Sequence, residues 1–172
     1  DNSFLQKLRI SADLEGSGNQ VTISNMDDDS STDGGVWSAS GDTSNITIDS
    51  GNYVEGTASL NFDMAVNYSQ GLFTNSTFTA VDLTNYINNG SIFLYVWIPS
   101  SPANALSNLT GFKLRLGTNS SNYYDWTTTV TTTNENLAFT SGWNLIRFDF
   151  VSKGTDVGTV TTTSIRYARI EI

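Results

Sequence analysis

The sequence predicts an all-β fold, an antiparallel β-sandwich, on three observations. Apolar and polar residues alternate with period two, most regularly in residues 57–66, 111–117, 142–150 and 166–172. Apolar segments of strand length recur every ten to fifteen residues or so, separated by Gly, Asn and Ser. No long stretch has a helical period. We therefore expect two antiparallel sheets packed around one core.

The alternation also predicts which way many side chains point. Residues 91–99 are apolar on both faces, which predicts a central strand covered on each side. In residues 111–117 Leu114 and Leu116 face inward, and Arg115 faces outward. One helical turn is expected at residues 81–87. Strands are expected at residues 4–14, 19–24, 36–40, 43–49, 57–66, 71–78, 91–99, 111–117, 124–131, 142–150, 159–164 and 166–172.

The length of 172 residues suits a single core. Residues 1–25 are expected to form a separate N-terminal strand or linker segment, in which a turn at residues 15–19 closes a hairpin. The sandwich domain is expected to occupy residues 26–172.

Charge and composition exclude several classes of function. A net charge of −9 repels nucleic acid and anionic lipid. No apolar run approaches the length of a membrane span, so no membrane insertion is expected. The sequence has no His and no Cys, which removes Ser-His-Asp and Cys-His catalysis, His-based metal sites and disulfides. Hard-cation binding, carbohydrate binding and paired-carboxylate hydrolysis remain.

Glycoside hydrolysis requires two carboxylates facing each other across a cleft. No two of the available acids stand in a recognisable catalytic motif, so the protein is not expected to be an enzyme. Ser, Thr and Asn make up 63 of the 172 residues, a composition typical of extracellular, cell-surface or virion proteins. The acids considered are Glu55, Asp63, Glu135, Asp149 and Glu171.

Five stretches, in this order and spacing, resemble carbohydrate-binding-module-like jelly-roll domains. They are "MDDDSSTDGGVW", "YVEGTASLNFDM", "VDLTNYINNGSIFLYVWIP", "LRLGTNSSNYYDW" and "SGWNLIRFDF". Such domains occur on bacterial surface proteins, glycoside hydrolases and phage structural proteins. The resemblance covers about residues 26–172 and implies a jelly roll of the concanavalin-like or galactose-binding-like kind. Its members include sugar binders, adhesive domains and purely structural domains.

The acidic loop Asp27, Asp28, Asp29 and Asp33 allows three interpretations. It is a solvated turn, a calcium site, or a polar contact with a partner chain. Oxygen ligands suit Ca²⁺, and the turn at residues 49–52 could add to them. The resemblance implies a structural calcium, although the further strand whose Asp helps to hold it in that group has no counterpart after "RYARIEI". The calcium interpretation takes Asp27, Asp29, Asp49 and Asn52 as ligands.

Sugar binding requires an aromatic ring with an exposed face beside polar groups. Tyr95, Trp97 and Tyr123, with Asp125, best meet that description, and Arg115 and Arg147 are the expected donors to an acidic or heavily hydroxylated ligand. The alternative for Arg147 is an ion-pair ladder with Asp149. The rings expected to pack in the core instead are Phe93, Trp126, Trp143, Phe148 and Phe150.

Two functions follow from these observations. The first is a non-catalytic carbohydrate-binding or adhesion module, which holds a glycan on a sheet face. The second is a structural domain of a phage particle or cell-surface filament, which contacts neighbouring protein subunits and binds no small ligand. The motifs in residues 26–172 suit both functions equally.

Overall fold

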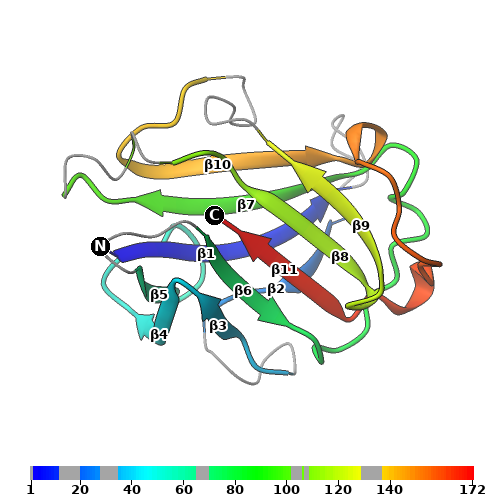
Figure 1. Ribbon diagram of the computed structural model, residues 1–172, viewed down its shortest axis with the longest axis horizontal. Helices are drawn as coiled ribbons and strands as arrows, with labels where there is room; N and C mark the ends of the chain where they lie inside the picture. Colours follow the sequence, from blue (N-terminus) through cyan, green and yellow to red (C-terminus); the bar gives the residue numbers. More distant parts are fainter. Residues whose placement is uncertain are drawn as a thin grey trace.

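The computed structural model describes residues 2–11, 20–27, 35–64, 70–101, 106, 109–128 and 137–172 (Figure 1). The described residues form β-strands and two short 3₁₀ helices, η1 (Phe150–Ser152) and η2 (Thr162–Ser164). The strands are β1 (Asn2–Ser11), β2 (Gln20–Ser24), β3 (Ser38–Gly41), β4 (Thr43–Asp49), β5 (Ser59–Met64), β6 (Gly71–Asn75), β7 (Ser91–Ile98), β8 (Lys113–Asn119), β9 (Asn122–Thr127), β10 (Gly142–Asp149) and β11 (Tyr167–Glu171).

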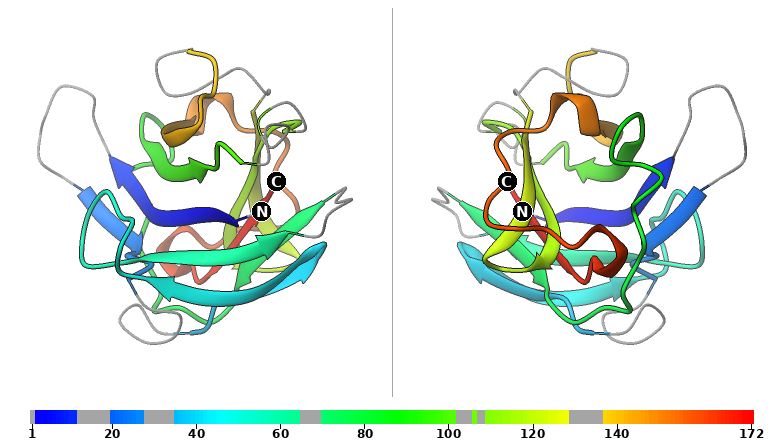
Figure 2. Two further views of the ribbon diagram at one scale, coloured as in Figure 1. Left: turned by 90° about the vertical axis from the view of Figure 1, so that its left-hand side faces the viewer. Right: turned by 90° about the vertical axis from the view of Figure 1, so that its right-hand side faces the viewer.

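The strands form two sheets, and within each sheet all paired strands are antiparallel. The six-stranded sheet has the order β10-β7-β1-β5-β4, with β2 paired to β1. The five-stranded sheet has the order β3-β6-β11-β8-β9. Figure 2 shows the strands from two sides, with β1 (blue) between β7 (green) and the β4–β5 pair (cyan). The all-β, β-sandwich-like fold expected from the sequence is confirmed.

One hydrophobic core lies between the sheets. In the six-stranded sheet, Leu94 on β7 and Ile146 on β10 are fully buried. In the five-stranded sheet, Leu114 on β8 is fully buried. Phe62 on β5 packs against Phe73 on β6 with 4.0 Å between ring centroids, so a direct ring contact joins the two sheets. Burial of this apolar surface is the main stabilising contribution.

Strand β1 is an interior strand of its sheet. Its backbone pairs with β7 along one edge from Phe4 to Ser11. Its other edge pairs with β5 over Asn2–Leu5 and with β2 over Leu8–Ser11. The β1–β2 pairing is that of the expected hairpin, whose turn at residues 15–19 lies outside the described residues. The division into residues 1–25 and 26–172 stays a prediction.

Two expected elements differ from the structure. Residues 159–164 form no strand, because Thr162–Ser164 is a 3₁₀ helix. Residues 81–87 form no helix: Val81 makes an isolated bridge to Ile165, and successive turns follow. Backbone hydrogen bonds in both directions, of 2.8 and 3.0 Å, hold the bridge. The Thr-rich residues 159–164 have a high strand propensity, but propensity alone does not make a strand, because a strand also requires a partner along its length.

Candidate functional site

Strand β7 buries one face and leaves the other partly exposed. Ile92, Leu94, Val96 and Ile98 point into the core and are at most 5% exposed. Phe93, Tyr95 and Trp97 alternate with them and are half-buried on the outer side of the sheet. The expectation that β7 is covered on both sides is therefore wrong, since the second sheet of the sandwich packs on the inner face only.

Strand β10 extends the outer strip. Its residues pair with β7 in register, so that Trp143 lies opposite Trp97, Leu145 opposite Tyr95 and Arg147 opposite Phe93. The two indole rings meet edge to face, with centroids 5.6 Å apart and an interplanar angle of 72°. All members are half-buried. We call this strip the aromatic face; it comprises Phe93, Tyr95, Trp97, Trp143, Leu145 and Arg147.

A polar group closes one end of the aromatic face. The Arg147 Nε donates to the carboxylate of Asp149 and lies 3.2 Å from the Ser91 hydroxyl oxygen. That hydroxyl donates to the same carboxylate. The expected ion pair between Arg147 and Asp149 is therefore present. Arg147 is held in place at the edge of the aromatic strip, with its side chain a quarter exposed.

The five-stranded sheet carries a different outer face. Cross-strand pairing sets Asp125, Arg115 and Arg169 in one row across β9, β8 and β11. Tyr123 and Tyr167 flank Gly117 in a neighbouring row, with their ring centroids 6.2 Å apart. Thr127, Lys113 and Glu171 form a third row. We call the set Lys113, Arg115, Tyr123, Asp125, Tyr167, Arg169 and Glu171 the arginine face.

Arg115 has three partners on the arginine face. Its Nε lies 3.1 Å from Asp125 Oδ1, its Nη1 lies 3.5 Å from Glu171 Oε2, and its guanidinium carbon lies 4.9 Å from the centre of the Tyr123 ring. Burial opposes the charged form of Arg115, but the hydrogen bond to Asp125 and the charge of Glu171 together raise its pKa above the ordinary value. Burial acts in the other direction on Tyr167: it opposes the charged phenolate and is the main reason why the pKa of Tyr167 is raised.

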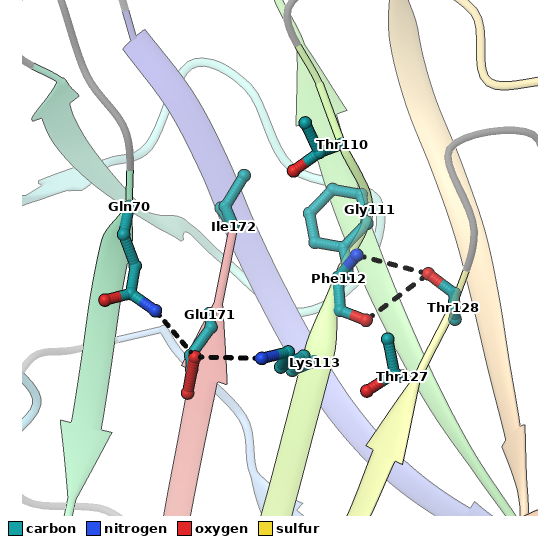
Figure 3. A pocket seen from close by; sticks show the side chains of 9 residues that line it. All are labelled: Gln70, Thr110, Gly111, Phe112, Lys113, Thr127, Thr128, Glu171 and Ile172. Atoms are coloured by element: carbon teal, nitrogen blue, oxygen red, sulfur yellow. Dashed lines mark hydrogen bonds and ion pairs between the residues drawn. The ribbon is translucent and has the colours of Figure 1, made fainter.

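A shallow cleft of about 140 Å³ lies at the end of this sheet (Figure 3). The Gln70 amide donates to Glu171 Oε1 at 2.8 Å, and Lys113 Nζ lies 3.8 Å from the same oxygen. Figure 3 shows both side chains directed at Glu171. Thr127 and Thr128 line the opposite side.

The structure divides the predicted ligand site. Tyr95, Trp97 and Arg147 lie together on the aromatic face. The other three predicted residues, Arg115, Tyr123 and Asp125, lie together on the arginine face, on the opposite side of the sandwich. The six residues therefore do not form one site.

The expected core rings also divide. Trp126, Phe148 and Phe150 are at most 3% exposed, which confirms their assignment to the core. Phe93 and Trp143 are half-buried on the aromatic face, so their core assignment is wrong. The alternation within residues 142–150 already placed Trp143 on the same side as Arg147. Residues of these two surfaces that the sequence did not single out as ligands include Lys113, Trp143, Tyr167, Arg169 and Glu171.

The predicted calcium ligands can be located in part. Asp49 and Asn52 form a closed turn, in which the Asp49 carboxylate accepts from the backbone N–H groups of Gly51 and Asn52 at 2.7 and 3.2 Å. Asp29 lies outside the described residues. Within the described ranges no three acidic side chains gather in a manner suited to a metal ion.

Asp27 differs from the other predicted calcium ligands. Its Oδ1 is buried and has no hydrogen-bond partner. Gly56 approaches it so closely that an added Cβ would stand 2.3 Å from this oxygen, and Gly56 has a φ of +76°. Only glycine fits at position 56, so the Asp27 carboxylate oxygen lies against the backbone of Gly56. A buried carboxylate oxygen without a donor suits a cation.

No family model matches the chain, and no curated protein or solved structure gives a significant match. The described part of the chain contains no helix with the length and apolar character needed to cross a bilayer.

Proposed function

We propose that the protein is a non-catalytic carbohydrate-binding or adhesion module, which holds a glycan on the aromatic face. The observation that carries the proposal is the half-buried strip formed by Tyr95, Trp97 and Trp143 on two adjacent strands. A pyranose ring has an apolar face of C–H groups that packs on an aromatic ring, and a rim of hydroxyl groups that requires hydrogen bonds.

The aromatic face offers both kinds of contact. Trp97 and Trp143 supply adjacent apolar rings. At the end of the aromatic face away from these two rings, Arg147 and Asp149 supply a charged donor and a charged acceptor, which their hydrogen bond holds in place. A large aromatic strip on a surface, bordered by polar groups, is typical of an interaction site. Its place on two paired strands keeps the rings in fixed positions, which lowers the entropy lost on binding.

The test is a glycan array followed by calorimetric titration of the glycans that bind. Trp97→Ala and Trp143→Ala are each expected to weaken binding by about tenfold or more, which corresponds to a loss of about 1.4 kcal/mol or more. The matched control is Tyr123→Ala, which removes a half-buried ring from the other sheet and should leave the affinity for a neutral glycan within about twofold. Equal losses for the three variants, or no binding glycan on the array, would contradict the proposal.

The second candidate function is a structural domain of a phage particle or cell-surface filament. The observation that favours it is strand β1, which pairs on both edges inside the six-stranded sheet. A strand in this position can be exchanged between neighbouring copies. Light scattering separates the two functions, because exchange requires a stable oligomer and a binding module does not. Either role places the protein outside the cell, on a cell surface or on a virion.

We also propose that the sandwich is a jelly roll. The support is the way in which the chain passes between the sheets. Strands β5, β7 and β10 belong to the six-stranded sheet, and the strand that follows each of them, namely β6, β8 and β11, belongs to the five-stranded sheet. Repeated crossing of this kind is typical of double-sheet jelly rolls.

We further propose a structural Ca²⁺ at Asp27, supported by its donor-free buried oxygen. EDTA should lower the melting temperature, by about 5–10 °C if calcium had been present at 100 times its dissociation constant. Asp27→Asn should remove this difference. Asp49→Asn serves as the control and should retain it, because the Asp49 carboxylate is occupied by its own turn. A melting temperature that EDTA leaves unchanged would contradict the calcium proposal.

A further inference from the structure

Three cationic side chains gather on the arginine face. Arg115 and Arg169 lie directly opposite each other on β8 and β11, and Lys113 lies two residues before Arg115 on the same face of β8. Like charges placed directly opposite destabilise a sheet. The chain as a whole has a net charge of −9 and only eight Lys and Arg residues. The cluster therefore concentrates positive charge on an otherwise acidic protein.

Two carboxylates form ion pairs with these three cations. Glu171 Oε2 lies 3.5 Å from Arg115 Nη1 and 3.4 Å from Arg169 Nε, and Glu171 Oε1 lies 3.8 Å from Lys113 Nζ. Asp125 pairs with Arg115. One carboxylate is thus shared by all three cations, and the five groups carry a net charge of +1. The Glu171 side chain is only 6% exposed, so the carboxylate that pairs with the three cations is buried beneath them.

Hydrogen-bond donors are in excess at this cluster. Each guanidinium has five N–H donors and the ammonium has three, whereas only two carboxylates face them, and that of Glu171 also accepts from Gln70. The Nε of Arg169 is buried and makes no hydrogen bond, although Glu171 Oε2, which likewise makes none, lies 3.4 Å away, so neither atom is open to a ligand. A ligand that completes this cluster must be rich in acceptors and negatively charged. A planar carboxylate meets both conditions, because it matches the fork of a guanidinium.

The cluster is accessible and lies beside a cavity. The side chains of Lys113, Arg115 and Arg169 are 45%, 21% and 27% exposed. Lys113 also lines the cleft at the end of the sheet (Figure 3). Gln70 and Thr127 supply neutral polar groups in this cleft, and Phe112 supplies an apolar wall. The Glu171 carboxylate also lines the cleft, and its charge is offset by the three cations that it contacts. The cleft, of about 140 Å³, is smaller than a typical small-molecule site, so it can take at most one small hydroxylated ring.

We infer that the cluster of Lys113, Arg115 and Arg169 binds the carboxylate of an acidic sugar unit, whose hydroxylated ring enters the adjacent cleft. This is a second binding site on the sheet opposite the aromatic face, and it does not rest on the function proposed above. The ligand class is a uronate. A free inorganic oxyanion has the same charge but lacks the ring, so the two ligands can be distinguished.

The test is an NMR titration of the full chain with glucuronate, glucose and sulfate at matched ionic strength. Glucuronate is expected to shift the backbone amides of Lys113, Arg115 and Arg169 in a saturable manner, and glucose is expected to leave them unchanged. Added salt should weaken the binding of glucuronate. Equal shifts with glucuronate and glucose would overturn the inference, and so would sulfate binding as tightly as glucuronate.

Variants assign the effect to the cluster. Lys113→Gln changes a side chain that is nearly half exposed, and it should weaken glucuronate binding at least fivefold without altering the melting temperature. Arg169→Gln should weaken it at least tenfold. Lys153→Gln is the matched control, because Lys153 pairs with Asp156 and belongs to neither face. Equal losses in Lys113→Gln and Lys153→Gln would refute the site.

Discussion

Deletion of residues 1–11 is expected to abolish the native fold. The backbone of β1 fills the space between β7 and β5, and it pairs along both edges. Its removal leaves the facing edges of two interior strands without partners. A buried backbone group that loses its partner costs about 1–3 kcal/mol, and a domain has only about 5–15 kcal/mol of stability in total. Several such losses exceed that margin.

Circular dichroism and a thermal melt check this prediction. The truncated chain should show no cooperative melting transition at 25 °C or above. A synthetic peptide of residues 1–19, added in excess, should restore the transition, because it supplies the missing strand in trans. If the truncated chain melts cooperatively near the temperature of the full chain, β1 is not an integral strand of the sheet.

Trp126→Ala is expected to destabilise the protein by about 3–5 kcal/mol. Trp126 is 2% exposed, and its ring lies 5.0 Å from that of Phe150 and 6.1 Å from that of Tyr124. Its indole N–H donates to the backbone carbonyl of Asp149 at 2.8 Å. Truncation leaves a cavity among the rings and removes one of the two donors to that carbonyl, the other being the Ser152 hydroxyl. The cavity therefore accounts for most of the expected loss.

Urea unfolding of Trp126→Ala and of the control Trp143→Ala measures the effect. Trp143 is the same residue type but is half-buried on the outer face, so its replacement should cost about 1 kcal/mol or less. Midpoints that shift equally for the two variants would show that the inner and outer faces have been assigned wrongly.

Local alternation predicted the direction of side chains well. In residues 122–127 and 142–150, the period of two placed Trp126 and Phe148 on inner faces, where both are buried. The same rule placed Arg115 and Arg147 outward, and both are partly exposed. These predictions succeeded because a strand's two faces are fixed by its own residues and need no information about its neighbours.

The grouping of residues into sites could not be predicted in this way. Tyr95 and Tyr123 both alternate outward, yet they lie on different sheets. Trp97 meets Trp143, and Arg115 meets Arg169, only through pairing between strands that are distant in the sequence. Such register depends on sheet order, which hydrophobic periodicity does not determine.

The four tryptophans offer the most direct test of glycan binding on the aromatic face. Trp37 and Trp126 are buried, with their indole N–H groups bonded to Ser24 Oγ and the Asp149 carbonyl. Trp97 and Trp143 lie half-buried on the aromatic face. An NMR titration with a glycan selected from the array should therefore shift the indole signals of Trp97 and Trp143 and leave those of Trp37 and Trp126 unchanged. A binding glycan that leaves the Trp97 and Trp143 signals in place would contradict the proposal.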